Sequence, residues 1–140
     1  MKSLLTLAFA LLAFTPISHA MEEPDMMAEN AVPTVKAVVF YSDSCGSCKI
    51  LEPKMKKAMK AINMDNVDVV KFDFSNKKAI EATKILADDK GLSDLLQKFG
   101  AKTGFVTLLN NDGAIVETIG VNDSVEDIAV KFAKSIVSAS

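Results

Sequence analysis

The chain contains two cysteines, and both lie in the tetrapeptide Cys45-Gly46-Ser47-Cys48. Two thiols at this spacing can close a disulfide with each other and open it again by exchange with the disulfide of another molecule. The reactive form is the thiolate, and a free cysteine with a pKa of about 8.5 is mostly protonated at neutral pH. A site that uses this pair must therefore lower the pKa of one of the two thiols.

The remaining composition narrows the chemistry. His19 is the only histidine, and all 16 basic residues are lysine. The chain after residue 19 therefore has no imidazole. It cannot supply the histidine for Cys-His or Ser-His catalysis or for a histidine-based zinc site. The lack of arginine weighs against a dedicated phosphate site. A net charge of −2 without a basic patch gives no field for nucleic acid.

The N-terminus has the pattern of a signal peptide. Lys2 precedes an apolar run at residues 4–14, and Ser18-His19-Ala20 provides the small residues expected at a cleavage site after Ala20. The run is too short for a membrane-spanning helix. We therefore expect a signal peptide at residues 1–20, a tether at 21–33, a domain at 34–140, and an exported protein, most simply periplasmic, without a stable membrane span.

The elements around the cysteines follow from hydrophobic patterns. Residues 35–41 are β-branched and aromatic, which predicts a buried strand. Apolar residues then recur at intervals of three or four, which predicts one buried face of a helix. They are Cys48, Leu51, Met55, Met59 and Ile62. Cys45 is thus expected at the start of the helix and Cys48 one turn later, on its buried face.

The rest of the chain predicts strands at 67–74, 104–109 and 114–119, with a turn at 110–113. Residues 77–99 read as two helical pieces divided at Gly91, the first with Ile80, Ile85 and Leu86 facing inward. Capping residues at 123–127 open a last helix. This order predicts the α/β class: a four-stranded mixed sheet, half parallel β-α-β and half β-hairpin, with helices on both faces.

A helix start suits the first cysteine to nucleophilic chemistry. Unpaired N–H groups and the positive end of the helix dipole stabilise a thiolate there. Cys45 is therefore expected to attack, and Cys48 to resolve the resulting mixed disulfide. Gly46 leaves room for a partner chain to approach. The pair carries two electrons itself, so no cofactor is needed.

Three alternatives use other properties of the same residues. A structural disulfide over so short a loop would contribute little stability. A Cu or Fe–S site would need ligands beyond two thiolates, from a second copy or from Met21, Met26 and Met27. A protein-binding module without redox turnover is the third.

The segment from Phe40 to Lys49, followed by Pro53, resembles the active-site segment of thioredoxins, with Pro53 at the position of that family's helix-kinking proline. Residues 99–109 resemble the segment that leads into the family's third core strand. The resemblance covers roughly residues 34–138. It implies a thioredoxin fold and a monomeric thiol-disulfide oxidoreductase that acts on protein thiols and disulfides, with an upstream redox partner.

The departures from the family pattern concern the surroundings of the cysteines. Val106 stands where the family has a cis-proline that faces the cysteines, and its peptide bond is expected to be trans. Val39 replaces a buried acid, which leaves Glu52 or Asp73 as the candidate proton acceptor for Cys48. Gly46, Ser47, Phe105 and Val106 are expected to contact the substrate, with an extended partner segment pairing along the edge at Val106. No histidine lies between the two cysteines to stabilise the reduced pair, as strong oxidants of this fold require, which favours a reductant or isomerase-like role.

Overall fold

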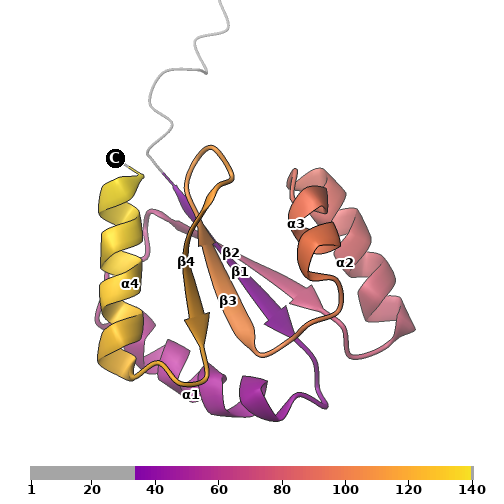
Figure 1. The fold of residues 1–140 in the computed structure, drawn as a ribbon, viewed down its shortest axis with the longest axis horizontal. Helices are drawn as coiled ribbons and strands as arrows, with labels where there is room; N and C mark the ends of the chain where they lie inside the picture. The colour runs from indigo at the N-terminus through magenta and orange to yellow at the C-terminus, as the bar shows by residue number, and fades with distance from the viewer. Residues whose placement is uncertain (1–33, 140) are drawn as a thin grey trace, which may run out of the picture.

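A computed structural model of the chain describes residues 34–139, which form four strands and four helices (Figure 1). Their bounds are β1 (Val35–Tyr41), α1 (Gly46–Lys60), β2 (Val67–Asp73), α2 (Lys77–Asp89), α3 (Ser93–Phe99), β3 (Phe105–Leu109), β4 (Ile115–Gly120) and α4 (Val125–Ser138). The expected signal peptide, the tether with its three methionines, and residue 140 lie outside the described residues. What the sequence predicts for them stays a prediction.

The four strands form one mixed sheet in the order β2-β1-β3-β4. β1 and β2 run parallel, with Val35 opposite Val67 and Tyr41 opposite Asp73. β3 is antiparallel to both β1 and β4. The predicted mixed sheet is therefore confirmed, and it is a thioredoxin fold. In this order β3 is an interior strand and β2 is an edge strand.

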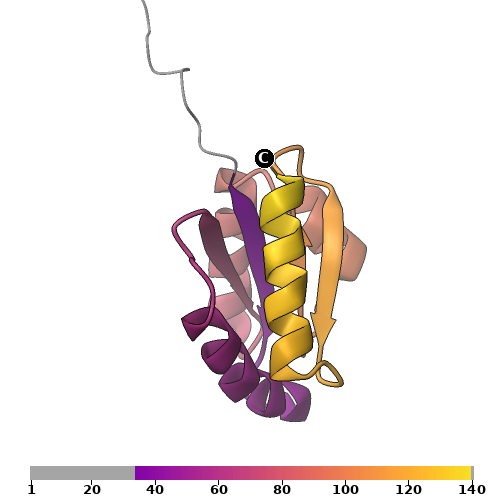
Figure 2. The same ribbon diagram turned by 90° about the vertical axis from the view of Figure 1, so that its left-hand side faces the viewer.

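Helices cover both faces of the sheet. Figures 1 and 2 show α1 and α4 on one face and α2 and α3 on the other. Alternate residues of each strand enter separate cores, because successive side chains point to opposite faces. Ala37, Val106 and Phe132 belong to the core under α1 and α4. Phe40 and Phe72 belong to the core under α2 and α3. The turn between β1 and α1, which leads to Cys45, is thus held by a strand that is packed on both sides.

One predicted core position is wrong. Ile85 is 64% exposed, whereas Thr83 and Ala87 are buried. Residues four apart share one face of a helix, so the inward face of α2 includes Thr83 and Ala87, and Ile85 lies on the far side. Thr83 tolerates burial because its hydroxyl accepts a hydrogen bond from the N–H of Asp73 (2.9 Å) and donates one to the carbonyl of Asp73 (3.1 Å). A polar residue whose hydroxyl is hydrogen-bonded, Thr83, therefore lies on the buried face of α2, where the apolar pattern had predicted Ile85.

None of the helices within residues 34–139 is long and apolar enough to cross a membrane.

Candidate active site

Cys45 is the capping residue of α1. Its backbone is extended (φ −78°, ψ 110°), and its sulfur accepts a hydrogen bond from the N–H of Cys48 at 3.1 Å. The turn before it is closed by the N–H of Cys45, which donates to the carbonyl of Ser42 at 3.0 Å. The first turn of α1 carries no acidic side chain. The N–H groups and dipole at this end therefore act on the sulfur of Cys45.

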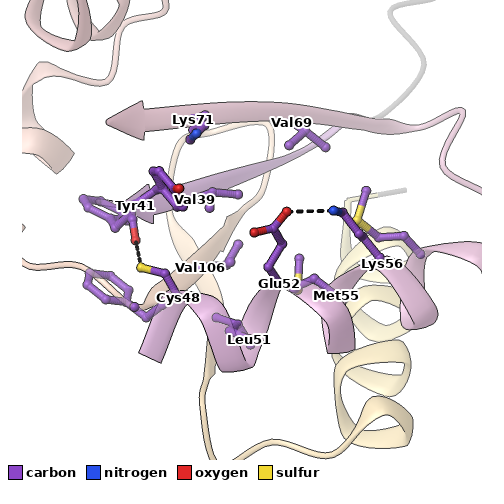
Figure 3. Close-up of a pocket in the computed structure, with 14 residues that line it drawn as sticks. Val39, Tyr41, Cys48, Leu51, Glu52, Met55, Lys56, Val69, Lys71 and Val106 are labelled. Carbon is purple, nitrogen blue, oxygen red and sulfur yellow. Dashed lines mark hydrogen bonds and ion pairs between the residues drawn. The ribbon is translucent and has the colours of Figure 1, made fainter. Parts of the chain in front are cut away.

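Cys45 and Cys48 are joined as a disulfide. The two cysteines differ in their surroundings, since Cys45 is partly exposed and Cys48 is only 5% exposed. The sulfur of Cys48 lies 3.7 Å from the carbonyl oxygen of Phe40 (Figure 3). In the reduced protein a thiol at that position could donate to this carbonyl, which favours its protonated form. A hydrogen bond to a sulfur that accepts, as at Cys45, favours the thiolate instead.

The segment that faces the disulfide is centred on Gly104, a residue that the sequence did not single out. Gly104 is buried with φ +92°, and its N–H donates to the carbonyl of Phe40 at 2.9 Å. A Cβ at this position would lie 2.7 Å from the Cβ of Ser47 and 3.3 Å from the sulfur of Cys45. Glycine is therefore required here by both conformation and space.

The expectation for Val106 is partly wrong. No peptide bond within residues 34–139 is cis, as expected for this valine. Its side chain, however, is fully buried in the core under α1 and α4, where it lines a cavity beside Cys48 and has no part in the outer surface. Val106 also pairs with Val39 on one side and Ile119 on the other, so β3 offers no free edge at this point to a partner strand. Gly104, two residues earlier, takes the place facing the cysteines.

The other predicted contact residues lie at or near the disulfide. Gly46 is exposed with open space around it, and Ser47 is partly exposed. Phe105 is partly buried, and its ring stacks on that of Phe40 with centroids 4.5 Å apart. Pro53 lies inside α1, where it cannot donate the usual hydrogen bond to the carbonyl of Lys49.

A cavity of about 330 Å³ extends from Cys48 along the inner face of α1. Figure 3 shows Glu52 of α1 reaching toward β1 and β2, with its carboxylate 2.7 Å from the Nζ of Lys56. That hydrogen bond, and the charge of Lys56, hold the pKa of Glu52 below its ordinary value. Glu52 follows Cys48 by four residues on one helix and lines the same cavity. Of the two candidate proton acceptors, Glu52 is therefore the one that lines the same cavity as Cys48.

Asp73, the second candidate, has other partners. It accepts hydrogen bonds from the hydroxyl (2.5 Å) and the N–H (2.9 Å) of Ser75 and lies 3.5 Å from the Nζ of Lys71. Its pKa is lowered chiefly by the hydroxyl of Ser75. Asp73 does not line the cavity that contains Cys48.

Lys71 and Tyr41 form the rim of the cavity at the edge of the sheet. The Nζ of Lys71 lies 3.6 Å from the centre of the Tyr41 ring, and the Tyr41 hydroxyl donates to Asp43 at 2.9 Å. The hydrogen bond to Asp43 raises the pKa of Tyr41. Within residues 34–139 there is no group of three or more His, Cys, Asp or Glu side chains that could hold a metal ion.

Comparison with known proteins agrees with the fold. The family model described as thioredoxin matches residues 25–86. Among solved structures, thioredoxin-2 of the malaria parasite, described as a component of its protein secretion machinery, is similar at 20% identity and a TM-score of 0.51. The match covers 75% of this chain and 86% of that one. StoA from Bacillus subtilis is 21% identical, with the same coverages and a TM-score of 0.49. No curated protein sequence matches the chain.

Proposed function

We propose that this chain, which has a thioredoxin fold, exchanges electrons with the thiols and disulfides of other proteins through Cys45 and Cys48. The observation that supports this most directly is the capping of α1 by a sulfur. The Cys48 N–H points at the Cys45 sulfur from 3.1 Å, while the sulfur of Cys48 is buried beside a carbonyl. The two cysteines are therefore suited to different steps.

In the reducing direction, the Cys45 thiolate attacks one sulfur of a partner's disulfide. A mixed disulfide forms, and the partner's other sulfur leaves as a thiolate. The Cys48 thiol then loses its proton and attacks the Cys45 sulfur, which releases the second partner thiolate. The partner has gained two electrons, the pair is left as a disulfide, and an external thiol reductant returns it to the dithiol.

Glu52 is the proposed acceptor of the Cys48 proton. Side chains four residues apart on a helix have Cβ atoms about 6 Å apart, a separation that a carboxylate or one water can bridge. The hydrogen bond from Lys56 and its positive charge lower the pKa of Glu52, so this carboxyl holds a proton less readily than an ordinary glutamate. The same ion pair makes it a weaker base, so resolution is expected to be slower than attack.

The surroundings of the pair favour a reductant or isomerase-like role. The residues between the cysteines, Gly46 and Ser47, carry no positive charge that would strongly stabilise the reduced pair. We therefore expect a reduction potential well below the roughly −120 mV of the strongest oxidants of this chemistry. Equilibration with glutathione measures it, and a value near −120 mV would show that the direction is wrong.

The activity itself is tested by reduction of insulin disulfides with dithiothreitol as the electron source. Wild type should accelerate the reaction, and Cys45→Ser should abolish the acceleration. Cys48→Ser should lose turnover yet accumulate a mixed disulfide. Ser138→Ala, at the last residue of α4, is the control variant and should accelerate the reaction as wild type does. If wild type shows no acceleration and instead carries Cu or an Fe–S cluster that Cys45→Ser loses, the metal-binding alternative is correct.

The proposal extends to the setting of the protein. We infer from the first 20 residues that the chain is exported, to a periplasm in the simplest case. We further propose that it acts there as a monomer. An oxidising compartment would supply the disulfides on which the pair acts. N-terminal sequencing of the exported form should begin at Met21.

A further inference from the structure

A shallow, largely apolar groove lies at the end of α1 that is opposite to the disulfide. One wall is formed by residues that follow α1 and the other by residues of α4: Ile62, Asn63 and Asn66, and Ala133, Ile136 and Val137. Its volume is about 360 Å³. Val137 is 76% exposed, more than any other large apolar residue within residues 34–139. An occupant would remove this surface from water, which is favourable.

The groove adjoins the point at which residues 21–33 join the described domain. The first residue of β1 donates its N–H to the carbonyl of Asn66, a residue of the groove, at 2.9 Å. The side chain of Asn111 accepts from the N–H of Thr34 at 2.9 Å and donates to the carbonyl of Ala139 at 3.5 Å. Figures 1 and 2 show β1 beginning beside the C-terminal end of α4. Both walls of the groove are therefore close to the start of β1.

The chain that precedes β1 is long enough to enter the groove. Three residues of extended chain span about 10 Å, and eight span about 27 Å. Val32 is three positions before Val35 and Met27 is eight, so either side chain can reach the groove. The match to the thioredoxin family model begins at residue 25, so most of this segment is aligned with that model.

The composition of the segment suits such a groove. Residues 21–33 contain no basic side chain and four carboxylates, those of Glu22, Glu23, Asp25 and Glu29. Their larger apolar side chains are those of Met21, Met26, Met27 and Val32. Methionine adapts to irregular surfaces, because its side chain is unbranched and flexible. This segment therefore fits an apolar surface that has positive charge beside it.

α1 has a row of lysines on the side that faces α4. Lys54 identifies this side, because its Nζ donates to the carbonyls of Val121 (2.8 Å) and Asp123 (2.9 Å), just before α4. Residues three apart are neighbours on a helix surface. Lys57 therefore lies beside Lys54, and Lys60 beside Lys57. The row continues along α1 toward the groove.

The last two lysines of this row have no acidic partner within the described residues. Lys57 and Lys60 are exposed, and neither takes part in an ion pair there. Asp65, also exposed, is the one carboxylate in the turn between α1 and β2. On the α4 side, Lys134 pairs with Glu117 at 2.7 Å. Positive charge is therefore in excess beside the groove.

We propose that residues 21–33 fold back into this groove, with their apolar side chains against Ile62 and Val137 and their carboxylates beside Lys57 and Lys60. The inference is independent of the proposed redox activity, because it concerns the opposite end of α1 and needs neither cysteine. The segment is then part of the folded domain rather than a free tether.

A nitroxide label on the segment tests its position in the full-length, oxidised protein. Both native cysteines are in the disulfide, so Ala28→Cys introduces a single free thiol for labelling. The label should broaden the amide NMR signal of Val137 strongly and that of Gly113 weakly. Gly113 is the control because its turn is held next to Thr34 by the side chain of Asn111. A segment that moves freely about Thr34 would broaden both signals alike.

Two valine changes in the labelled chain test the apolar contact. Val137→Asp should reduce the broadening of Asn63, on the other wall, to the level of Gly113. Val130→Asp, at a 64% exposed valine on α4, should leave that broadening unchanged.

Charge reversal tests the role of the lysines. Lys57→Glu/Lys60→Glu should release the segment, whereas Lys78→Glu/Lys84→Glu, at two exposed lysines of α2, should not. Changing the four carboxylates of the segment to lysine in the Lys57→Glu/Lys60→Glu chain should restore the broadening, because the charges are again opposite.

Equal broadening of Val137 and Gly113, or broadening centred on the residues around Cys48, would overturn the proposal. Equal effects of the two valine changes would do the same, as would equal effects of the two double lysine variants. Broadening of an isotope-labelled chain by a separate nitroxide-labelled chain would show that a second copy fills the groove instead. The comparison of Val137 with Gly113 changes nothing in the described domain, so it decides the matter if a variant does not fold.

Discussion

Replacing Gly104 by alanine tests how the disulfide is held. The added Cβ would lie 2.7 Å from the Cβ of Ser47, a separation that real structures essentially never show. Ser47 cannot turn its Cβ away, because the position of this atom is set by the backbone of α1. Either the loop before β3 or the start of α1 must move.

Two separate costs add in this variant. Alanine at φ +92° is in a region that L-residues avoid, at about 1–2 kcal/mol. Crowding in a packed site costs a further ~1–3 kcal/mol. The free energy of unfolding should therefore fall by at least about 2 kcal/mol, which corresponds to a Tm lower by roughly 10 °C in a domain of this size.

The assay is thermal and urea unfolding of the oxidised protein, with a second glycine of positive φ as the control. Gly91 also has positive φ (+66°), but no atom lies within 4 Å of the Cβ it would acquire. Gly91→Ala should therefore show only the conformational cost. Ser47→Gly removes the atom at 2.7 Å, so the double variant Gly104→Ala/Ser47→Gly should recover the steric part.

Equal losses of stability in Gly104→Ala and Gly91→Ala would refute the steric argument. So would a double variant whose loss equals the sum of the two single losses, because Ser47 would then not be the atom in the way.

Three further predictions concern the proton acceptor and the helix cap. Glu52→Gln should slow the decay of the mixed disulfide by up to about 100-fold and shift the pH dependence of this decay to higher pH. Glu81→Gln on α2 is the control and should change neither the rate nor its pH dependence. Stopped-flow kinetics measure the decay in both variants. Ser124→Ala should cost about 1 kcal/mol, because the Ser124 hydroxyl accepts the N–H of Asp127 at 3.0 Å and closes a capping box at α4; urea unfolding decides this, and an unchanged midpoint would contradict it. The pKa of Asp127 is lowered by its hydrogen bonds from Ser124, so its stabilising effect is complete above the unfolded pKa near 3.9 and is lost as the pH falls through the folded value. Asp127→Asn should accordingly flatten the loss of Tm below about pH 4, and an unchanged acid profile would count against this role.

The order of elements was predictable because each has a local signal. The β-branched run at 35–41, the break at Gly91 and the turn at 110–113 all correspond to features of the structure. Boundaries differ by one residue at β2, β3 and β4. Ile85 was misplaced since a period of 3.6 leaves two interpretations of a short apolar pattern, and only packing against β2 selects Thr83.

The features of the site also fall into those that local sequence predicts and those that depend on contacts between distant segments. A CxxC pair at the end of a strand and the start of a helix is a local arrangement, so the unequal environments of Cys45 and Cys48 follow from chain order alone. Which residue faces the disulfide depends instead on how β3 is aligned with β1, two segments more than 60 residues apart in the sequence. The resemblance to the family segment pointed to Val106, whereas the register of β3 places Gly104 next to the disulfide.

The amino-acid sequence by itself determined the redox-capable pair, its place at a helix start, the absence of an imidazole near it and the α/β topology, because these depend on neighbours along the chain. Tertiary structure alone decided that Gly104 packs on the sulfur, that Glu52 rather than Asp73 shares a cavity with Cys48, and that α4 and the end of α1 form a groove beside the start of β1. Each of these depends on contacts between distant segments, whose spacing is set by how helices and strands pack rather than by local propensity.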